Sequence, residues 1–149
     1  MIQLRHTGLY VKDIQKEARF YLKVFNMFIV SDNVKQSDAL ISDLIGKDTV
    51  VTITKLITEQ GKASGFDDML ELIQCNNSIV EKECYGKIYQ FGCMHLSFGV
   101  NDIELTVDKI LHYGGKQITK IHVMNNGNKC CFCPDPESNW LELIEQAKR

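Results

Sequence analysis

The chain has 149 residues and a net charge of −2, and it is 44% hydrophobic and 24% charged. This apolar content suffices for one domain or for two small fused halves, and it excludes a disordered chain. The charge balance lacks the basic excess that binds a phosphate backbone, and no apolar run approaches the length of a membrane span. Since the first residues also lack the pattern of a secretory signal, we expect a cytoplasmic protein that binds neither nucleic acid nor membrane.

The chain contains six cysteines, at positions 75, 84, 93, 130, 131 and 133. Without a secretory signal, reduced thiols are favoured over a disulfide framework. Alternation along a strand would place Cys131 and Cys133 on one face and Cys130 on the other. The spacing does not fit an ordinary zinc site, so we interpret these residues as small buried hydrophobic side chains.

Two sequence patterns recur in the two halves of the chain. Residues 6–14 read HTGLYVKDI and residues 95–103 read HLSFGVNDI, with His, Val, Asp and Ile at identical offsets. Residues 69–73 read MLELI and residues 140–144 read WLELI. A repeat of this kind indicates two similar structural units.

The repeat predicts one domain, residues 1–149, built from two modules. Module one covers residues 1–75 and module two covers residues 93–149, with residues 76–92 as the connection. In each module the hydrophobic pattern predicts a strand, a helix and three further strands.

The predicted elements follow from local patterns. Asp13 and Asp102 are suited to begin the two helices, and we expect a short helix within 37–45 and an exposed loop at 61–65. The expected strands cover residues 3–11, 27–32, 48–57 and 68–75 in module one, and residues 94–100, 116–124, 129–133 and 139–145 in module two.

Neither module can bury both faces of its sheet alone. Two such βαβββ modules side by side would form a curved open barrel with helices outside. The predicted fold class is therefore α+β.

Four residues occupy matching places in the repeat: His6 and Glu71 in module one, and His95 and Glu142 in module two. A pseudo-twofold relation between the modules would bring the four side chains together. Two imidazoles and two carboxylates suit one divalent ion, namely Ni, Co, Zn, Mn or Fe(II), with open positions for substrate.

The two glutamates stand between leucines in apolar strands, where an ionised carboxylate is costly unless it is paired or bound to metal. Either glutamate alone is best interpreted as part of a solvated sheet face. Two at matched positions, each with a matched histidine, favour a metal site.

At this point the sequence resembles the vicinal oxygen chelate superfamily, which includes glyoxalase I, methylmalonyl-CoA epimerase, extradiol dioxygenases and bleomycin-resistance proteins. HTGLYVKDI, FYLKVFNM, HLSFGVNDI and DPESNWLELI carry the resemblance. It implies the glyoxalase fold, with His6, Glu71, His95 and Glu142 as metal ligands. It also implies a proton shuttle through an enediolate, with the metal as Lewis acid and Glu142 or Glu71 as the base.

The ligand order His, Glu, His, Glu is that of glyoxalase I, whereas the epimerase pattern usually has Gln where this chain has Glu71. The glyoxalase arginine that binds glutathione is replaced by Gly8-Leu9-Tyr10-Val11, which counts against a glutathione substrate. The resemblance therefore implies a lyase or isomerase acting on a small α-oxo, hemithioacetal or acyl-thioester substrate. The alternatives are a dioxygenase or thiol-transferring resistance enzyme, and a drug-binding protein of the bleomycin-resistance type.

Two further residues are candidates for substrate contact. Tyr10 shares a predicted strand face with His6, and His122 falls in a predicted strand of module two. We also expect a homodimer with twofold symmetry, in which the metal site is completed within one chain or between two.

Overall fold

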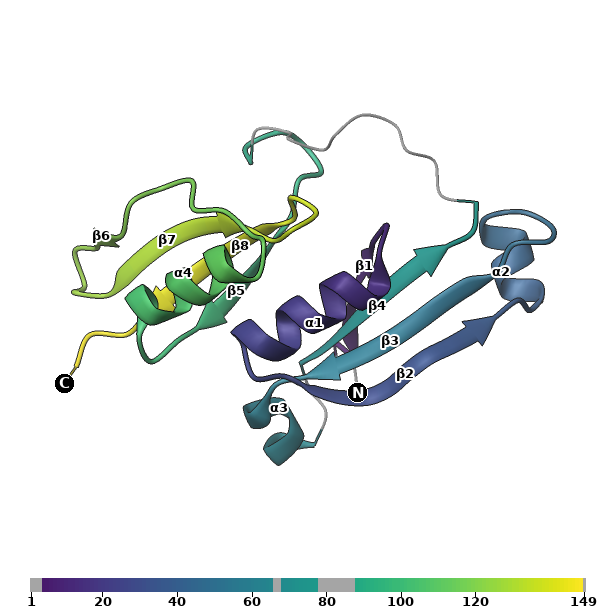
Figure 1. Ribbon diagram of the computed structural model, residues 1–149, viewed down its shortest axis with the longest axis horizontal. Helices are drawn as coiled ribbons and strands as arrows, with labels where there is room; N and C mark the ends of the chain where they lie inside the picture. The colour runs from purple at the N-terminus through teal and green to yellow at the C-terminus, as the bar shows by residue number, and fades with distance from the viewer. Residues whose placement is uncertain (1–3, 66–67, 78–87, 149) are drawn as a thin grey trace. The chain divides into compact units, whose positions relative to one another are not determined.

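The computed structural model describes residues 4–65, 68–77 and 88–148. The chain divides into two compact units, Met1–Val80 and Glu81–Arg149. Each unit contains one four-stranded sheet with a long helix against it (Figure 1). Within the predicted connection at 76–92, residues 78–87 lie outside the described part of the chain.

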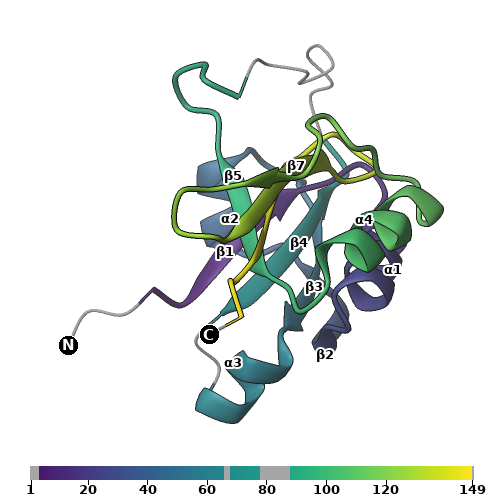
Figure 2. The same ribbon diagram turned by 90° about the vertical axis from the view of Figure 1, so that its left-hand side faces the viewer.

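The first unit follows the predicted order of elements, including the short helix expected within 37–45, and it adds one further short helix after β3. Its strand order is β1-β4-β3-β2, with β1 parallel to β4 and the other pairs antiparallel. The short helices α2 and α3 precede and follow β3, so they lie at opposite ends of that strand (Figure 2). The elements are β1 (His6–Tyr10), α1 (Ile14–Val24), β2 (Phe28–Gln36), α2 (Ala39–Leu44), β3 (Val51–Ile57), α3 (Glu59–Ser64) and β4 (Met69–Cys75).

The second unit repeats this topology without the short helices. Its strand order is β5-β8-β7-β6, again with the first strand parallel to the last and the other pairs antiparallel. The βαβββ repeat and the α+β fold class predicted from the sequence are therefore confirmed. The elements are β5 (His95–Gly99), α4 (Ile103–His112), β6 (His122–Val123), β7 (Lys129–Pro134) and β8 (Trp140–Glu145).

The core of each unit lies between its long helix and one face of its sheet. In the first unit Tyr21 of α1 and Leu72 of β4 are both 0% exposed. In the second unit Ile110 of α4 and Leu143 of β8 are also 0% exposed. Burial of a side chain of this size stabilises the fold by roughly 1.5–3 kcal/mol. Strand side chains alternate between the two faces of a sheet. Glu71 and Glu142, which stand between buried leucines, therefore lie on the face turned away from the helix.

The same hydrogen bonds begin the long helix in both units. Asp13 Oδ1 accepts from the backbone N–H of Lys16 at 3.0 Å, and Asp102 Oδ1 accepts from that of Leu105 at 2.9 Å. Both residues are therefore the N-caps that the sequence predicted.

The residue that follows each Leu-Glu-Leu-Ile segment makes a second contact with its helix. Gln74 Oε1 accepts from the backbone N–H of Ile14 at 2.9 Å, and Glu145 Oε2 accepts from that of Ile103 at 2.7 Å. The first N–H of each helix, which has no intrahelical partner, is thus bonded to the end of the last strand.

Three predictions about local structure are wrong. The strand predicted at 27–32 continues to Gln36 because irregularities in its register keep it paired with β3. The loop expected at 61–65 belongs largely to α3, which Thr58 caps and which ends at left-handed Gly65. Of the strand predicted at 116–124, only His122–Val123 is paired as a strand, because the preceding segment bonds irregularly to the carbonyls of Phe132 and Pro134.

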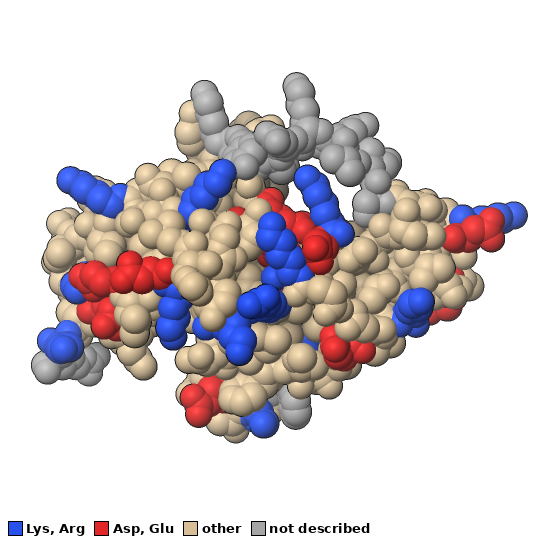
Figure 3. Space-filling model, viewed as in Figure 1, with Lys and Arg blue, Asp and Glu red and all other residues tan. Residues whose placement is uncertain are grey.

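Acidic and basic side chains are interspersed on the face shown in Figure 3. Among the described residues, no helix combines the length and the apolar character needed to cross a membrane.

The cap at Asp102 gives a test of the helix start. We expect Asp102→Ala to lower the free energy of unfolding by about 1 kcal/mol, because the N–H of Leu105 loses its acceptor. Asp102→Asn keeps an acceptor oxygen and should lose only a few tenths of that amount. Urea denaturation of the three proteins measures the difference, and equal losses in both variants would contradict the capping role.

Candidate metal centre

The first histidine–glutamate pair lies on two neighbouring strands. The parallel register of β1 and β4 places His6 opposite Met69 and Gly8 opposite Glu71. His6 and Glu71 are therefore on one face of the sheet, one pleat apart. His6 Nε2 lies 3.4 Å from Glu71 Oε2.

The second pair repeats this geometry. The register of β5 and β8 places His95 opposite Trp140 and Ser97 opposite Glu142. His95 Nε2 lies 3.4 Å from Glu142 Oε2, the same separation as in the first unit. The two copies of the sequence repeat thus hold the same two functional groups in the same way.

A small residue lies opposite each glutamate. An added Cβ at Gly8 would meet Ile73 Cδ1 at 3.5 Å, which is ordinary van der Waals contact. The strand itself therefore does not require glycine there.

Lys55 is a further residue that contacts the first histidine–glutamate pair. It lies on β3 directly opposite Glu71, and its Nζ is 2.8 Å from Glu71 Oε1. The Glu71 side chain is only 9% exposed. Solvent therefore screens its charge little, and the adjacent ammonium group of Lys55 compensates that charge. The two oxygens of this carboxylate therefore face different partners, His6 and Lys55.

Glu142 has neutral partners at the corresponding places. Phe132 takes the position of Lys55 opposite Glu142, and its ring packs edge-on against His95 at 5.5 Å between centroids. Cys130 Sγ lies 3.4 Å from Glu142 Oε1. Burial, and then the hydrogen bond to Glu142, raises the pKa of the Cys130 thiol to about 11, so the thiol is protonated at neutral pH and donates to the carboxylate. The Glu142 side chain is 22% exposed, more than that of Glu71.

The donor atoms fit a divalent metal ion. Atoms that each lie about 2.1 Å from one ion are roughly 3.0–3.4 Å apart at tetrahedral or octahedral angles. The observed separation of 3.4 Å within each pair falls at the upper end of that range and exceeds an ordinary hydrogen bond. An imidazole nitrogen and a carboxylate oxygen are ligands that Zn, Co, Ni, Mn and Fe accept.

The predicted four residues thus occur as two pairs, one in each unit. His6 and Glu71 meet in the first unit, and His95 and Glu142 meet in the second. That the two pairs share one metal ion stays a prediction.

The two candidate substrate contacts lie on the same sheet faces as the pairs. Tyr10 is on β1, two pleats beyond His6 along the same face, and is 56% exposed. His122 is exposed on the edge strand β6, opposite Cys130. Their contact with substrate stays a prediction.

Sequence reasoning missed Lys55 and the contact of Cys130 with Glu142. A signal for Lys55 was present, since it is the single charged residue in the alternating segment VTITKLI. The predicted alternation of the cysteines is confirmed: Cys131 and Cys133 are buried, with their sulfurs 3.9 Å apart, and Cys130 is on the other face. The five described cysteines are free thiols, and Cys84 lies outside the described residues.

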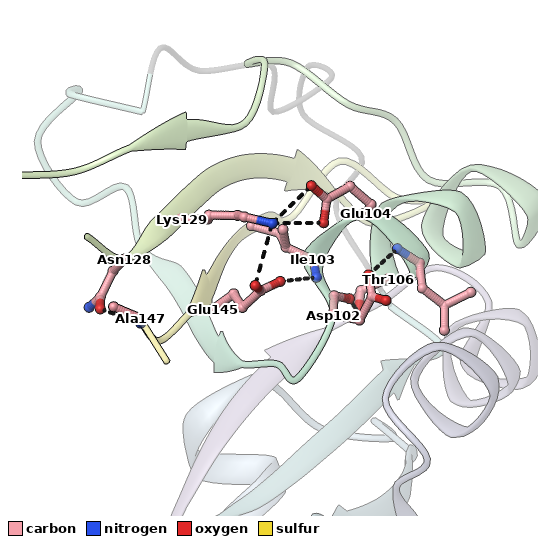
Figure 4. Close-up of polar contacts among 9 residues, drawn as sticks. Asp102, Ile103, Glu104, Thr106, Asn128, Lys129, Glu145 and Ala147 are labelled. Atoms are coloured by element: carbon pink, nitrogen blue, oxygen red, sulfur yellow. Dashed lines mark hydrogen bonds and ion pairs between the residues drawn. The ribbon is translucent and has the colours of Figure 1, made fainter. Parts of the chain in front are cut away.

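Three carboxylates at the start of α4 also lie close together: Asp102, Glu104 and Glu145. Figure 4 shows that these carboxylates are paired with other groups of the protein: Lys129 Nζ contacts both Glu104 and Glu145. The hydrogen bond from Lys129 lowers the pKa of Glu104. With Asp102 and Glu145 accepting from backbone N–H groups, this cluster caps a helix, and we do not assign a metal to it.

The raised pKa of Cys130 is testable by alkylation at defined pH. We expect slow reaction with iodoacetamide at pH 8, because a thiol with a pKa of about 11 is almost wholly protonated there. Glu142→Gln removes the negative charge beside the thiol, so its pKa should fall and the rate at pH 8 should rise. Mass spectrometry of the peptide resolves Cys130, and an unchanged rate in the variant would contradict the contact.

Comparison with known proteins identifies the family of this chain. The model of the Glyoxalase/Bleomycin resistance protein/Dioxygenase superfamily matches residues 3–143. A lactoylglutathione lyase of Schizosaccharomyces pombe is 27% identical over 98% of this chain, which spans about half (48%) of that protein. A probable lactoylglutathione lyase of Synechocystis is 27% identical, with 98% of this chain and 97% of that protein covered.

Among solved structures, a glyoxalase family protein from Bacillus cereus matches with a TM-score of 0.87 and 13% identity, covering 99% of this chain and 96% of that one. This likeness supports the fold. Since the family model spans nearly the whole sequence, the chain belongs to the Glyoxalase/Bleomycin resistance protein/Dioxygenase superfamily.

Proposed function

We propose that this protein is a metal-dependent lyase or isomerase that moves a proton next to a carbonyl group of a small substrate. One divalent ion is held by His6, Glu71, His95 and Glu142, from one chain or from two chains of a homodimer. The supporting observation is the equal 3.4 Å separation of Nε2 and Oε2 in two pairs that occupy matching register positions.

The bound metal would supply a Lewis acid that stabilises negative charge on two neighbouring substrate oxygens. The remaining chemistry belongs to the protein. His6 and His95 hold neutral nitrogens toward the ion, and Glu71 contributes a fixed negative charge. Glu142 takes the proton from carbon and returns it to the neighbouring carbon.

The difference between the two glutamates supports this division. The Lys55 ammonium lies 2.8 Å from Glu71 Oε1 and holds that oxygen in one position. Glu142 has a neutral thiol and an aromatic ring in the equivalent places and is more exposed. It therefore has no charged contact that holds its carboxylate in one place, and its greater exposure gives it more room to move.

The substrate class is a small α-oxo, hemithioacetal or acyl-thioester compound. The two relatives named as lactoylglutathione lyases support a hemithioacetal. The Gly8-Leu9-Tyr10-Val11 segment offers no cation to a glutathione carboxylate, so we do not assign glutathione.

Metal binding provides the first test. We expect calorimetry on stripped protein to show stoichiometric binding of Ni, Co, Zn or Mn. His6→Ala, His95→Ala and Glu142→Ala should each weaken binding by more than the roughly 10–100-fold that follows loss of an outer-shell partner. Glu104→Gln is the matched control, because it removes a carboxylate from the capping cluster, and it should bind as the wild type does.

Failure of the wild type to bind any of these ions would overturn the enzyme proposal. The protein would then be better explained as a binder of the bleomycin-resistance type, one of the classes that the superfamily name covers.

The roles of the two glutamates can be separated by Glu142→Gln and Glu71→Gln. With metal at saturation, Glu142→Gln should slow deuterium exchange into an α-hydroxy ketone such as hydroxyacetone by about 10²–10⁴-fold, the usual contribution of a general base. Glu71→Gln should mainly weaken metal binding. NMR of the substrate in D₂O and calorimetry measure the two effects, and equal losses of exchange in both variants would contradict the assignment.

A further inference from the structure

Around the two histidine–glutamate pairs, the units differ at the position opposite each glutamate. Lys55 fills it in the first unit and Phe132 in the second, at the same register position of the third strand. Glu71 is the one acidic partner of Lys55 among the described residues. The backbone repeat does not explain this difference, because both strands pair with the same geometry.

A lysine beside a metal ligand carries an electrostatic cost. An ammonium group that contacts Glu71 competes with a divalent cation for the same carboxylate and repels that cation. If the site needed only to bind metal, an uncharged residue such as Phe132 would serve, as it does in the second unit. This electrostatic cost indicates that the positive charge of Lys55 serves a purpose other than metal binding.

The two Glu71 oxygens show how metal and lysine can coexist. Oε2 faces His6 and Oε1 faces Lys55, so one oxygen can bind an ion while the other retains the ammonium. An ammonium group has three donor hydrogens, and one contact with Glu71 leaves two available. The Lys55 side chain is 37% exposed, so solvent or a ligand can reach it.

Lys55 has polar residues opposite it on both neighbouring strands, Ser31 and Glu71, and apolar residues further along the same face. Ile53 and Ile73 lie one pleat further along β3 and β4, and both pack against a buried cluster of Ile41, Val51 and Cys75. Ion pairs are stronger next to such surfaces than in open water. An anionic group placed beside Lys55 would therefore gain more than at an open surface.

We propose that Lys55 is the anion-binding residue of the site and that the substrate is a small α-oxo or α-hydroxy acid, with its carboxylate against the Lys55 ammonium. This inference rests on the proposed metal-dependent function and narrows its substrate class. Lys55 then acts as a specificity-determining residue that favours charged over uncharged compounds with the same pair of neighbouring oxygens.

Pyruvate and methyl pyruvate test this preference, because both present neighbouring oxygens and only pyruvate is charged. We would titrate each into the Co²⁺-loaded protein and follow the visible absorption of the ion, which reports binding without turnover. The wild type should bind pyruvate more tightly than methyl pyruvate. Lys55→Met should reduce that preference by about tenfold or more, the usual effect of losing a charge-assisted hydrogen bond.

Two control variants make the outcome specific. Lys55→Arg keeps the charge and should keep the preference for pyruvate to within about threefold, since arginine also binds carboxylates. Lys129→Met removes a lysine that pairs with Glu104 and Glu145, and it should leave the preference unchanged. Calorimetry with Co²⁺ should show that Lys55→Met binds the metal at least as tightly as the wild type, because a competing cation is gone.

The possible failures are distinguishable. A wild type that binds no Co²⁺ overturns both the metal-dependent function and the role of Lys55. A wild type that binds Co²⁺ but does not prefer pyruvate overturns only the role of Lys55. If Lys55→Met loses Co²⁺, pyruvate and methyl pyruvate to the same extent, the lysine is a structural partner of Glu71 and the inference is wrong.

Discussion

The parallel pairing of the first and last strands of each unit is the constraint on which the site depends. A parallel neighbour fixes which residues share a face and how far apart they lie along the strand. Here it places His6 beside Glu71 and His95 beside Glu142 with the same atomic separation. A shift of one residue in either register would turn a glutamate toward the helix, where an uncompensated carboxylate is costly. The long helix and the buried leucines that flank each glutamate oppose such a shift, so core packing and ligand placement have the same cause.

The repeat conserves the backbone of the site while its neighbours diverge. Both units use an aspartate N-cap and a side-chain acceptor just after the last strand to hold the helix start. The third strand presents different residues to each glutamate. Lys55 lies opposite Glu71 and contacts it, whereas Phe132 lies opposite Glu142 and the thiol of Cys130 contacts it. Two carboxylates that are equivalent in position thus differ in charge environment and exposure. The unequal roles that we propose for Glu71 and Glu142 need such a difference in surroundings. A few substitutions on the third strand are enough to create it.

Much of the fold could be predicted from the sequence because the signals are local and repeated. Alternation over 95–99, the two aspartate caps and the two Leu-Glu-Leu-Ile segments define the modules and select His6, Glu71, His95 and Glu142 as candidates. The missed features depend on pairing, which a single sequence does not contain. The length of β2 is set by its irregular register with β3. The shortness of β6 is set by the irregular bonding of the segment before it to carbonyls of β7. The neighbours of the glutamates, Lys55 and Cys130, became apparent only when the order of strands was known.

The hydrogen bond from each helix start to Gln74 or Glu145 has a consequence for assembly. These acceptors lie three residues after Glu71 and Glu142 on the same strands. In each unit these hydrogen bonds hold the last strand, the long helix and the histidine–glutamate pair together without a bound cation. For a centre with four ligands, most of the conformational entropy of ordering the side chains is then lost during folding of the separate units. In the four-ligand centre that we propose, each pair is already ordered before metal binds, so more of the coordination energy is available as affinity for the ion.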